Sequence, residues 1–145
     1  MFMKQLSAIA KYWCIYAHKN LQSLEIVGSE HSVIMYLSIQ NNISQDTLST
    51  QLVLDKGTIA KILVKLEQKG LVSRVVNEQN KREKIVSLTE KGEEEVKSVY
   101  AIVNLWETEL LEGISETDQT IFLDVLTSMT ERAKSLSVLE KETKI

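Results

Sequence analysis

The sequence predicts a mainly α-helical protein with one small β-hairpin, and three observations lead to this fold class. Apolar residues recur at helical spacing through most of the 145 residues. Capping residues and glycines divide these stretches into six segments of helical length. Only two neighbouring runs, Leu71–Val76 and Lys84–Leu88, are short and rich in Val, Ile and Leu, which is typical of strands.

The first two helices are predicted from their spacing and from the residues between them. Residues 4–26 form the first helix, Gly28 ends it, and Ser29 caps a second helix that runs to about Gln40. The apolar positions of the first helix are Leu6, Ile9, Ala10, Trp13, Ala17, Leu21 and Leu24.

Two further helices are expected before the hairpin. The stretch "NNIS" (residues 41–44) reads as a turn, and Ser44 then caps a short helix that ends near Leu52. Asp55 caps the next helix, which covers residues 56–69 and stops at Gly70.

The hairpin and two more helices complete the chain. The segment "NEQNKRE" (residues 77–83) is expected to be a solvent-exposed loop with a basic tip. Thr89 begins the fifth helix, and "SETD" at Ser115–Asp118 is a capping box for the sixth. The apolar positions of these two helices are Val96, Val99, Tyr100, Val103, Trp106, Leu110, Ile121, Phe122, Val125, Leu126, Met129, Ala133 and Leu136.

This order of elements predicts a winged helix-turn-helix, in which a short helix, a tight turn and a longer helix precede a two-stranded wing. We expect a dimerisation helix at residues 1–28, the winged domain at residues 29–92, and C-terminal dimerisation helices at residues 93–145. The terminal helices carry more apolar surface than a small winged domain can cover, so a second copy of the chain is the expected cover.

The composition limits the class of protein. The chain is 43% apolar and 26% charged, as in an ordinary globular protein. No apolar run approaches about 18 residues, and the N-terminus lacks a signal-peptide core, so we expect a cytoplasmic protein without a membrane span. The single cysteine, Cys14, excludes an internal disulfide and a multi-cysteine metal site, and no cofactor is expected.

The charge of the chain is distributed unevenly. Residues 55–92 hold nine Lys and Arg and five Asp and Glu, a local charge of +4. The whole chain carries −3, so the remainder carries −7. Because charges beyond roughly 10 Å are screened at ordinary salt, the local balance determines what this segment attracts. A solvated face of mixed charge is the alternative explanation.

The fourth helix has the properties of a helix that enters the major groove of DNA. Its apolar residues, Ile59, Ile62, Leu63 and Leu66, fall on one side. The other side offers small residues for close approach and donors for bases and phosphates. Exposed Val64 suits a thymine methyl group, although a lone exposed valine often has no role. The expected DNA-binding residues are Ser44, Gln45, Lys56, Gly57, Thr58, Ala60, Lys61, Lys65, Lys81, Arg82 and Lys84.

The stretch "LDKGTIAKILVKLEQKGLVSRVVNEQNKREKIVSLTEKG" (residues 54–92) resembles the MarR family of transcriptional regulators. Its "LEQKGLVSR" and "VSLTEKG" blocks, at this separation, carry the resemblance. The resemblance implies a homodimer with interlocking terminal helices, one reading helix per subunit in the major groove of operator DNA, and a wing arginine in the minor groove. It also implies an Asp-x-Arg motif in the wing, but Asn80 replaces the acid before Arg82, whose expected partner is Asp55.

The resemblance also implies regulation by a signal. Many relatives bind small aromatic or lipophilic compounds, and Tyr12, Trp13, Tyr16, Tyr36 and Trp106 are candidates for lining such a pocket or for the core. Some relatives sense peroxide through a lone cysteine, and Cys14 is either such a sensor, with His18 four residues on, or a packed small side chain. A Cys14–His18 metal pair falls short of a zinc site, and His31 is expected at the surface or in helix packing.

Two other classes of function fit the sequence less well. An enzyme is not expected, because the sequence has no phosphate-binding loop, no catalytic Ser/His/Asp or Cys/His pattern and only two histidines. A winged helix used only for protein–protein contact is the stronger alternative, although it would not need cations on both the fourth helix and the wing.

Overall fold

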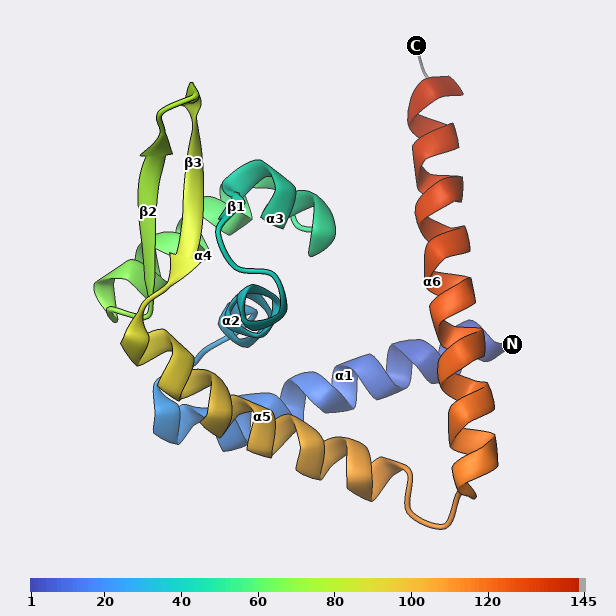
Figure 1. The fold of residues 1–145 in the computed structure, drawn as a ribbon. Coiled ribbons are helices and arrows are strands. Elements are labelled where there is room, and N and C mark those ends of the chain that lie inside the picture. Colours follow the sequence, from blue (N-terminus) through green and yellow to red (C-terminus); the bar gives the residue numbers. More distant parts are fainter. Residues whose placement is uncertain (144–145) are drawn as a thin grey trace. The chain divides into compact units, whose positions relative to one another are not determined.

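The computed structural model describes residues 1–143 and contains two compact units, one covering residues 1–105 and one beginning at residue 106. The chain forms α1 (Phe2–Leu21), a 3-10 turn η1 (Gln22–Leu24), α2 (Glu30–Ile39), β1 (Ile43–Ser44), α3 (Gln45–Gln51), α4 (Lys56–Gln68), β2 (Val72–Asn77), β3 (Asn80–Leu88), α5 (Glu90–Leu110) and α6 (Glu116–Thr143) (Figure 1). The predicted class, mainly α with a small β wing in a winged helix-turn-helix, is confirmed.

Local side-chain caps account for three of the helix starts. The Ser44 Oγ accepts from the Thr47 amide at 3.0 Å, the Asp55 Oδ1 accepts from the Thr58 amide at 2.8 Å, and the Ser115 Oγ accepts from the Asp118 amide at 3.1 Å. These bonds satisfy amide donors that have no partner within the helix. The caps predicted at Ser44, Asp55 and Ser115 are therefore confirmed. Ser29 stands at the N-cap position of α2, but its side chain makes no capping hydrogen bond there, so that predicted cap is wrong.

The first helix ends earlier than predicted. It stops at Leu21, and the chain continues through η1 to Glu25, which has a left-handed φ of 56°. This turn buries Ile26, which is 1% exposed, in the core. The predicted continuation to residue 26 is wrong because an uninterrupted helix would not make this turn.

The sheet has three strands, in the order β1-β3-β2, where two had been expected. The "NNIS" segment was predicted as a turn, but Ile43 and Ser44 pair with Val86 and Ile85 of β3. The two asparagines before them hold β3 in place: the Asn41 Oδ1 accepts from the Leu88 amide at 3.0 Å, and the Asn42 Oδ1 accepts from the Ser87 hydroxyl at 2.6 Å.

The wing differs from the predicted loop with a basic tip. Its strands come within two residues of each other, so Glu78 and Gln79 lie between the ends of β2 and β3. Val76 pairs with Lys84 but Asn77 pairs with Asn80, which leaves residues 81–83 as a bulge in β3. The prediction that Lys81 and Arg82 occupy the tip is wrong, because asparagine side chains tighten the turn and the cations fall on the strand behind it.

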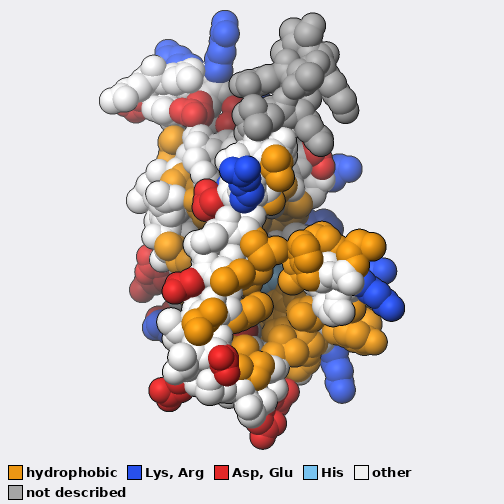
Figure 2. Space-filling view, turned by 90° about the vertical axis from the view of Figure 1, so that its right-hand side faces the viewer, with side chains coloured by type: hydrophobic (Ala, Val, Ile, Leu, Met, Phe, Trp, Pro, Cys, Tyr) orange, Lys and Arg blue, Asp and Glu red, His pale blue; other side chains and the backbone are white. Residues whose placement is uncertain are grey.

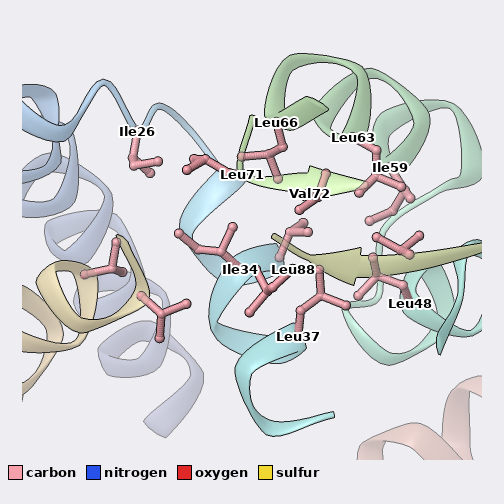
Figure 3. Close-up of a cluster of buried hydrophobic side chains, with 14 of the residues drawn as sticks. Ile26, Ile34, Leu37, Leu48, Ile59, Leu63, Leu66, Leu71, Val72 and Leu88 are labelled. Carbon is pink, nitrogen blue, oxygen red and sulfur yellow. The ribbon is translucent and has the colours of Figure 1, made fainter. Parts of the chain in front are cut away.

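The core of the first unit lies between α2, α3, α4 and the sheet. Figure 3 shows Ile34 and Leu37 of α2, Leu48 of α3, and Ile59, Leu63 and Leu66 of α4 among the buried side chains that meet Val72 and Leu88. Each of the six helical residues is 0% exposed. Burial of such side chains stabilises a fold by roughly 1.5–3 kcal/mol apiece, so this core fixes one face of α4.

The two sequence blocks on either side of the wing meet at one point. The Thr89 amide donates to the Leu71 carbonyl at 3.0 Å, and the Thr89 hydroxyl donates to the Gly70 carbonyl at 2.6 Å. A Cβ at Gly92 would stand 2.1 Å from the Leu71 carbonyl oxygen, so only glycine permits this approach. "KGLV" and "LTEKG" thus join the end of α4 to the start of α5.

The terminal helices expose apolar side chains. On α1, Phe2, Tyr12 and Ile15 are 59–65% exposed. On α6, considered by itself, several apolar residues of the predicted stripe are exposed: Ile121, Phe122, Val125, Met129 and Leu136, together with Leu123. Figure 2 shows hydrophobic side chains at the surface in this view. None of the described helices combines the length and apolar character that a membrane crossing requires.

Candidate nucleic-acid interface

Helix α4 presents a small and polar face to solvent. Its opposite face is fixed by the buried Ile59, Leu63 and Leu66. The exposed residues of the helix are Lys56, Gly57, Lys61, Val64, Lys65 and Gln68, and Thr58 and Ala60 are half-buried. The structure therefore places the cations predicted on this helix at its surface.

The start of α4 is held by Asp55. Its Oδ2 accepts from the Thr58 hydroxyl at 2.5 Å, in addition to the amide bond at Oδ1. The pKa of Asp55 lies below its usual range. The main cause is the hydrogen bond from the Thr58 hydroxyl, and the next is the bond from the Thr58 amide. The Thr58 hydroxyl proton is thus occupied by the cap and is not free for a phosphate in this conformation.

The polar residues at the start of α3 are also used within the fold. Ser44 is 9% exposed, and its hydroxyl donates to the Thr47 Oγ1 at 2.8 Å. The Gln45 Oε1 accepts from the Arg74 Nη1 at 3.3 Å. Both residues were predicted to hold a phosphate. The hydroxyl proton of Ser44 is used within the fold, whereas Gln45 uses only its side-chain carbonyl oxygen in this contact.

A cavity of about 300 Å³ lies between α3, α4 and the wing. It brings together four of the predicted residues, Gln45, Ala60, Arg82 and Lys84, which come from three different elements. The lining also includes Asp46, Arg74 and Glu83, but not the predicted Lys81. The wing bulge therefore directs Arg82 and Lys84 towards α4.

The expected pair between Asp55 and Arg82 is not formed within residues 1–143. Asp55 is engaged by Thr58, and the exposed Arg82 has its backbone amide bonded to the Asn80 Oδ1 at 3.3 Å. Asn80 thus orders the backbone of the bulge rather than the guanidinium. The Asn77 Nδ2 holds the other side of the bulge by donating to the Glu83 Oε2 at 2.9 Å.

Comparison with known proteins identifies this arrangement. Residues 28–84, from the start of α2 into β3, match the model of the MarR family. The chain carries a MarR family domain. The crystal structure of a MarR transcriptional regulator from Methanosarcina mazei Go1 is similar with a TM-score of 0.89 and 28% identity, over 93% of this chain and 97% of that one. The crystal structure of MarR gives a TM-score of 0.86 and 26% identity, over 94% and 92%.

Two further similarities agree with this assignment. The HTH-type transcriptional regulator BilQ of Clostridioides difficile (strain CD3) is 24% identical over 110 residues, which are 76% of this chain and 74% of that protein. The S. aureus MepR–DNA complex shares the fold with a TM-score of 0.82 and 24% identity, over 92% and 98%. Residues 28–84 thus carry a MarR family domain, and the chain has the winged helix-turn-helix fold of MarR transcriptional regulators.

The MarR domain contains an internal brace that sequence reasoning missed. The Arg74 Nη2 on β2 donates to the Glu67 Oε2 on α4 at 2.5 Å, while its Nη1 reaches Gln45 on α3. The Arg74 side chain is 12% exposed, and its hydrogen bond is the main reason that the pKa of Glu67 lies below the usual range. Both residues belong to the "LEQKGLVSR" block, so this block was the signal for the brace.

A second missed contact fixes the far end of α4. The Lys69 Nζ donates to the Glu30 Oε2 at 2.5 Å and to the Glu25 carbonyl at 2.6 Å, and Glu30 is 2% exposed. The Glu30 Oε2 also accepts from the Val27 amide at 3.0 Å. Lys69 contributes to the local charge of +4 over residues 55–92, but it joins α4 to the start of α2.

The candidate sensor residues lie on α1. Cys14 and His18 are exposed in the single chain, and no group of three or more potential metal ligands occurs in the described residues. Trp13 stacks with Tyr16 at 6.1 Å between ring centroids and meets the edge of His31 at 5.3 Å. His31 therefore packs between α1 and α2, and burial lowers its pKa.

The other proposed pocket residues are scattered. Tyr12 is 64% exposed, and Tyr36 is half-buried with its hydroxyl donated to the Gln40 Oε1 at 2.7 Å. Trp106 belongs to the second unit. An effector pocket formed by these residues stays a prediction.

Proposed function

We propose that this protein binds double-stranded operator DNA as a homodimer, with α4 in the major groove and the wing over the adjacent minor groove. The observation that carries the proposal is the joint placement of α4 and the wing cations. The exposed face of α4 carries Lys61 and Lys65, and the cavity beside it carries Arg82 and Lys84. Cations from two elements on one side of the domain suit a phosphate backbone flanked by two grooves.

The same fold occurs in the S. aureus MepR–DNA complex, which supports DNA binding as the role of this fold. A homodimer is supported by the apolar side chains that α1 and α6 expose. Dimerisation through residues 1–28 and 93–145 would give two reading helices related by a two-fold axis, so the operator would be a pseudo-palindrome.

Regulation completes the proposal. The protein would act as a repressor that a small aromatic or lipophilic compound, or an oxidant acting on Cys14, releases from DNA. Because the proposed target is genomic DNA, a cytoplasmic location is also part of the proposal.

Two substitutions test the DNA contacts. Arg82→Ala should weaken binding to specific and random DNA by similar factors, because the minor groove offers potential and shape more than a base code. It should also make the salt dependence shallower by about one phosphate contact. Lys61→Ala should cost on the order of 1–3 kcal/mol on the specific site, and much less on random DNA, if it reads a base edge.

The measurement is fluorescence anisotropy of labelled duplexes, selected from a random pool by the purified protein, at several salt concentrations. Lys97→Ala is the matched control, because Lys97 on α5 is also an exposed cation but lies outside α4 and the wing. Wild-type affinity of Arg82→Ala for both duplexes would show that the wing does not touch DNA. No tight complex even at low salt would favour a protein-contact module instead.

A further inference from the structure

The exposed face of α4 contains one apolar side chain of substantial size. Val64 is 42% exposed and lies one turn beyond Lys61, on the side opposite the buried Leu63 and Leu66. It belongs neither to the buried core nor to the apolar residues packed against that core. The fold of the described chain therefore gives Val64 no packing role.

Helix formation does not account for this valine either. A β-branched residue has a restricted χ1 in a helix and a lower helix propensity than Lys, Gln or Glu. The neighbouring exposed positions carry such favourable residues, Lys61, Lys65 and Gln68. A rigid pair of methyl groups at this position is best explained by an apolar surface that covers it in a complex.

We propose that Val64 contacts the C5-methyl group of a thymine and makes the protein selective for thymine at that base pair. This inference rests on the proposed function, which places the exposed face of α4 in the major groove. The thymine methyl is the apolar group that base pairs present there, and small apolar side chains recognise it. Val64 lies eight residues after Lys56, about 12 Å along a helix of about 18 Å, so it lies two thirds of the way along the reading face.

The flanking side chains fit this assignment. Lys61 offers a donor one turn earlier, and Lys65 extends beside Val64 on the exposed side, where it suits the phosphate backbone. Ala60, at the cavity next to the wing, is small enough to allow close approach of the helix. Apolar contact with a methyl group and polar contact with neighbouring groups are then available from one stretch of α4.

Replacement of thymine by uracil isolates the methyl group. A duplex selected from a random pool would be resynthesised with deoxyuridine at each thymine in turn, which removes one methyl group and leaves base pairing intact. We expect one substitution per half-site to weaken wild-type binding about fourfold, the effect of losing one buried methyl-sized group. Val64→Ser changes both subunits of the proposed homodimer, so it should bind the thymine duplex about as weakly as the wild type binds a duplex with deoxyuridine at that position in both half-sites, and it should no longer distinguish the two.

The matched control is Val27→Ser, because Val27 is 44% exposed but lies in the turn before α2. This variant should retain the full preference for thymine. Uracil substitutions that leave wild-type binding unchanged at every position, or that weaken Val64→Ser as strongly as the wild type, would overturn the inference while the proposed function stood. Failure to select any duplex bound more tightly than random DNA would refute the proposed function itself.

Discussion

Replacement of Arg74 by methionine should destabilise the winged domain without unfolding it. Arg74 is the residue through which β2 holds α3 and α4, by its bonds to Gln45 and Glu67. Methionine keeps most of the buried aliphatic stem and removes the guanidinium. The variant therefore measures the brace and not the loss of packing.

The magnitude follows from the geometry. The bond to Glu67 is short and charge-assisted, and such hydrogen bonds contribute about 1.5–3 kcal/mol. The Glu67 side chain is 33% exposed, so water can hydrate its carboxylate when Arg74 is lost, and this reduces the loss of stability. The 3.3 Å bond to Gln45 adds little, and removal of the buried, unpartnered Arg74 Nε offsets part of the loss. We expect a net loss of about 1.5–2 kcal/mol.

The effect should depend on pH in a defined direction. Arg74 lowers the pKa of Glu67 in the folded state. A carboxyl group with a lowered folded pKa stabilises the fold above its unfolded pKa, about 4.3 for glutamate, and this contribution is lost as pH falls through the folded value. The difference between the wild type and Arg74→Met should therefore be full at pH 7 and shrink below about pH 4.

The assay is urea unfolding followed by circular dichroism at one fixed protein concentration, because dimerisation makes apparent stability depend on concentration. With a slope of about 2 kcal/mol per molar, the midpoint should fall by about 0.75–1 M at pH 7. Lys97→Met is the control, because its pair with Glu94 is 72% and 70% exposed and should contribute well under 1 kcal/mol. Equal midpoints for Arg74→Met and Lys97→Met would refute the brace.

Three further predictions follow from the terminal helices, the thiol and the helix-turn-helix turn. Analytical ultracentrifugation at micromolar concentration should show a homodimer, and a stable folded monomer would remove the basis of the proposed architecture. Cys14→Ser should bind DNA like the wild type in reducing buffer. If an organic peroxide releases the wild type from DNA but not the variant, oxidant sensing is assigned to Cys14. If the peroxide affects both proteins equally, Cys14 is a packed side chain and not a sensor. Val53 has a left-handed φ of 55° and is 81% exposed. Val53→Asn should therefore relieve backbone strain and raise the unfolding free energy by about 0.5–1 kcal/mol. A lower urea midpoint for the variant would indicate that the valine is needed for a contact.

The parts of the fold that sequence reasoning located correctly are those that local chemistry specifies. The caps at Ser44 and Asp55 act on amides three residues away. The buried side of α4 follows from the 3.6-residue period of Ile59, Leu63 and Leu66. Because one side of this helix is buried, the exposed position of Lys61 and Lys65 was predictable as well.

The errors concern contacts between distant residues. A strand of two residues, Ile43–Ser44, carries no periodic pattern, and its partner β3 lies about 40 residues away in sequence. The tip of the wing was misplaced because the bulge at residues 81–83 interrupts the alternation that marks a strand. The partner of Lys69 is Glu30, 39 residues earlier, so composition alone could not show that this lysine is used internally.

The unequal charge distribution therefore serves two purposes in this domain. Lys69 and Arg74 neutralise Glu30 and Glu67, and Lys91 donates to the Lys69 carbonyl at 2.7 Å, so these three cations hold α4, β2 and α5 together. The cations that remain exposed on α4 and beside it in the wing are Lys56, Lys61, Lys65, Arg82 and Lys84.

The first group fixes the geometry in which the second is presented. The turn before α4 is fixed by the buried Ser49, whose hydroxyl donates to the Leu54 carbonyl at 2.6 Å. Arg74 holds the side of α4, and Lys69 holds its end. In the proposed complex, a reading helix fixed at these three points would lose little conformational freedom on binding, so more of its contact energy would appear as affinity. In the proposed complex, an acidic protein can bind an anionic duplex because Lys61, Lys65, Arg82 and Lys84 lie on α4 and around the cavity beside it.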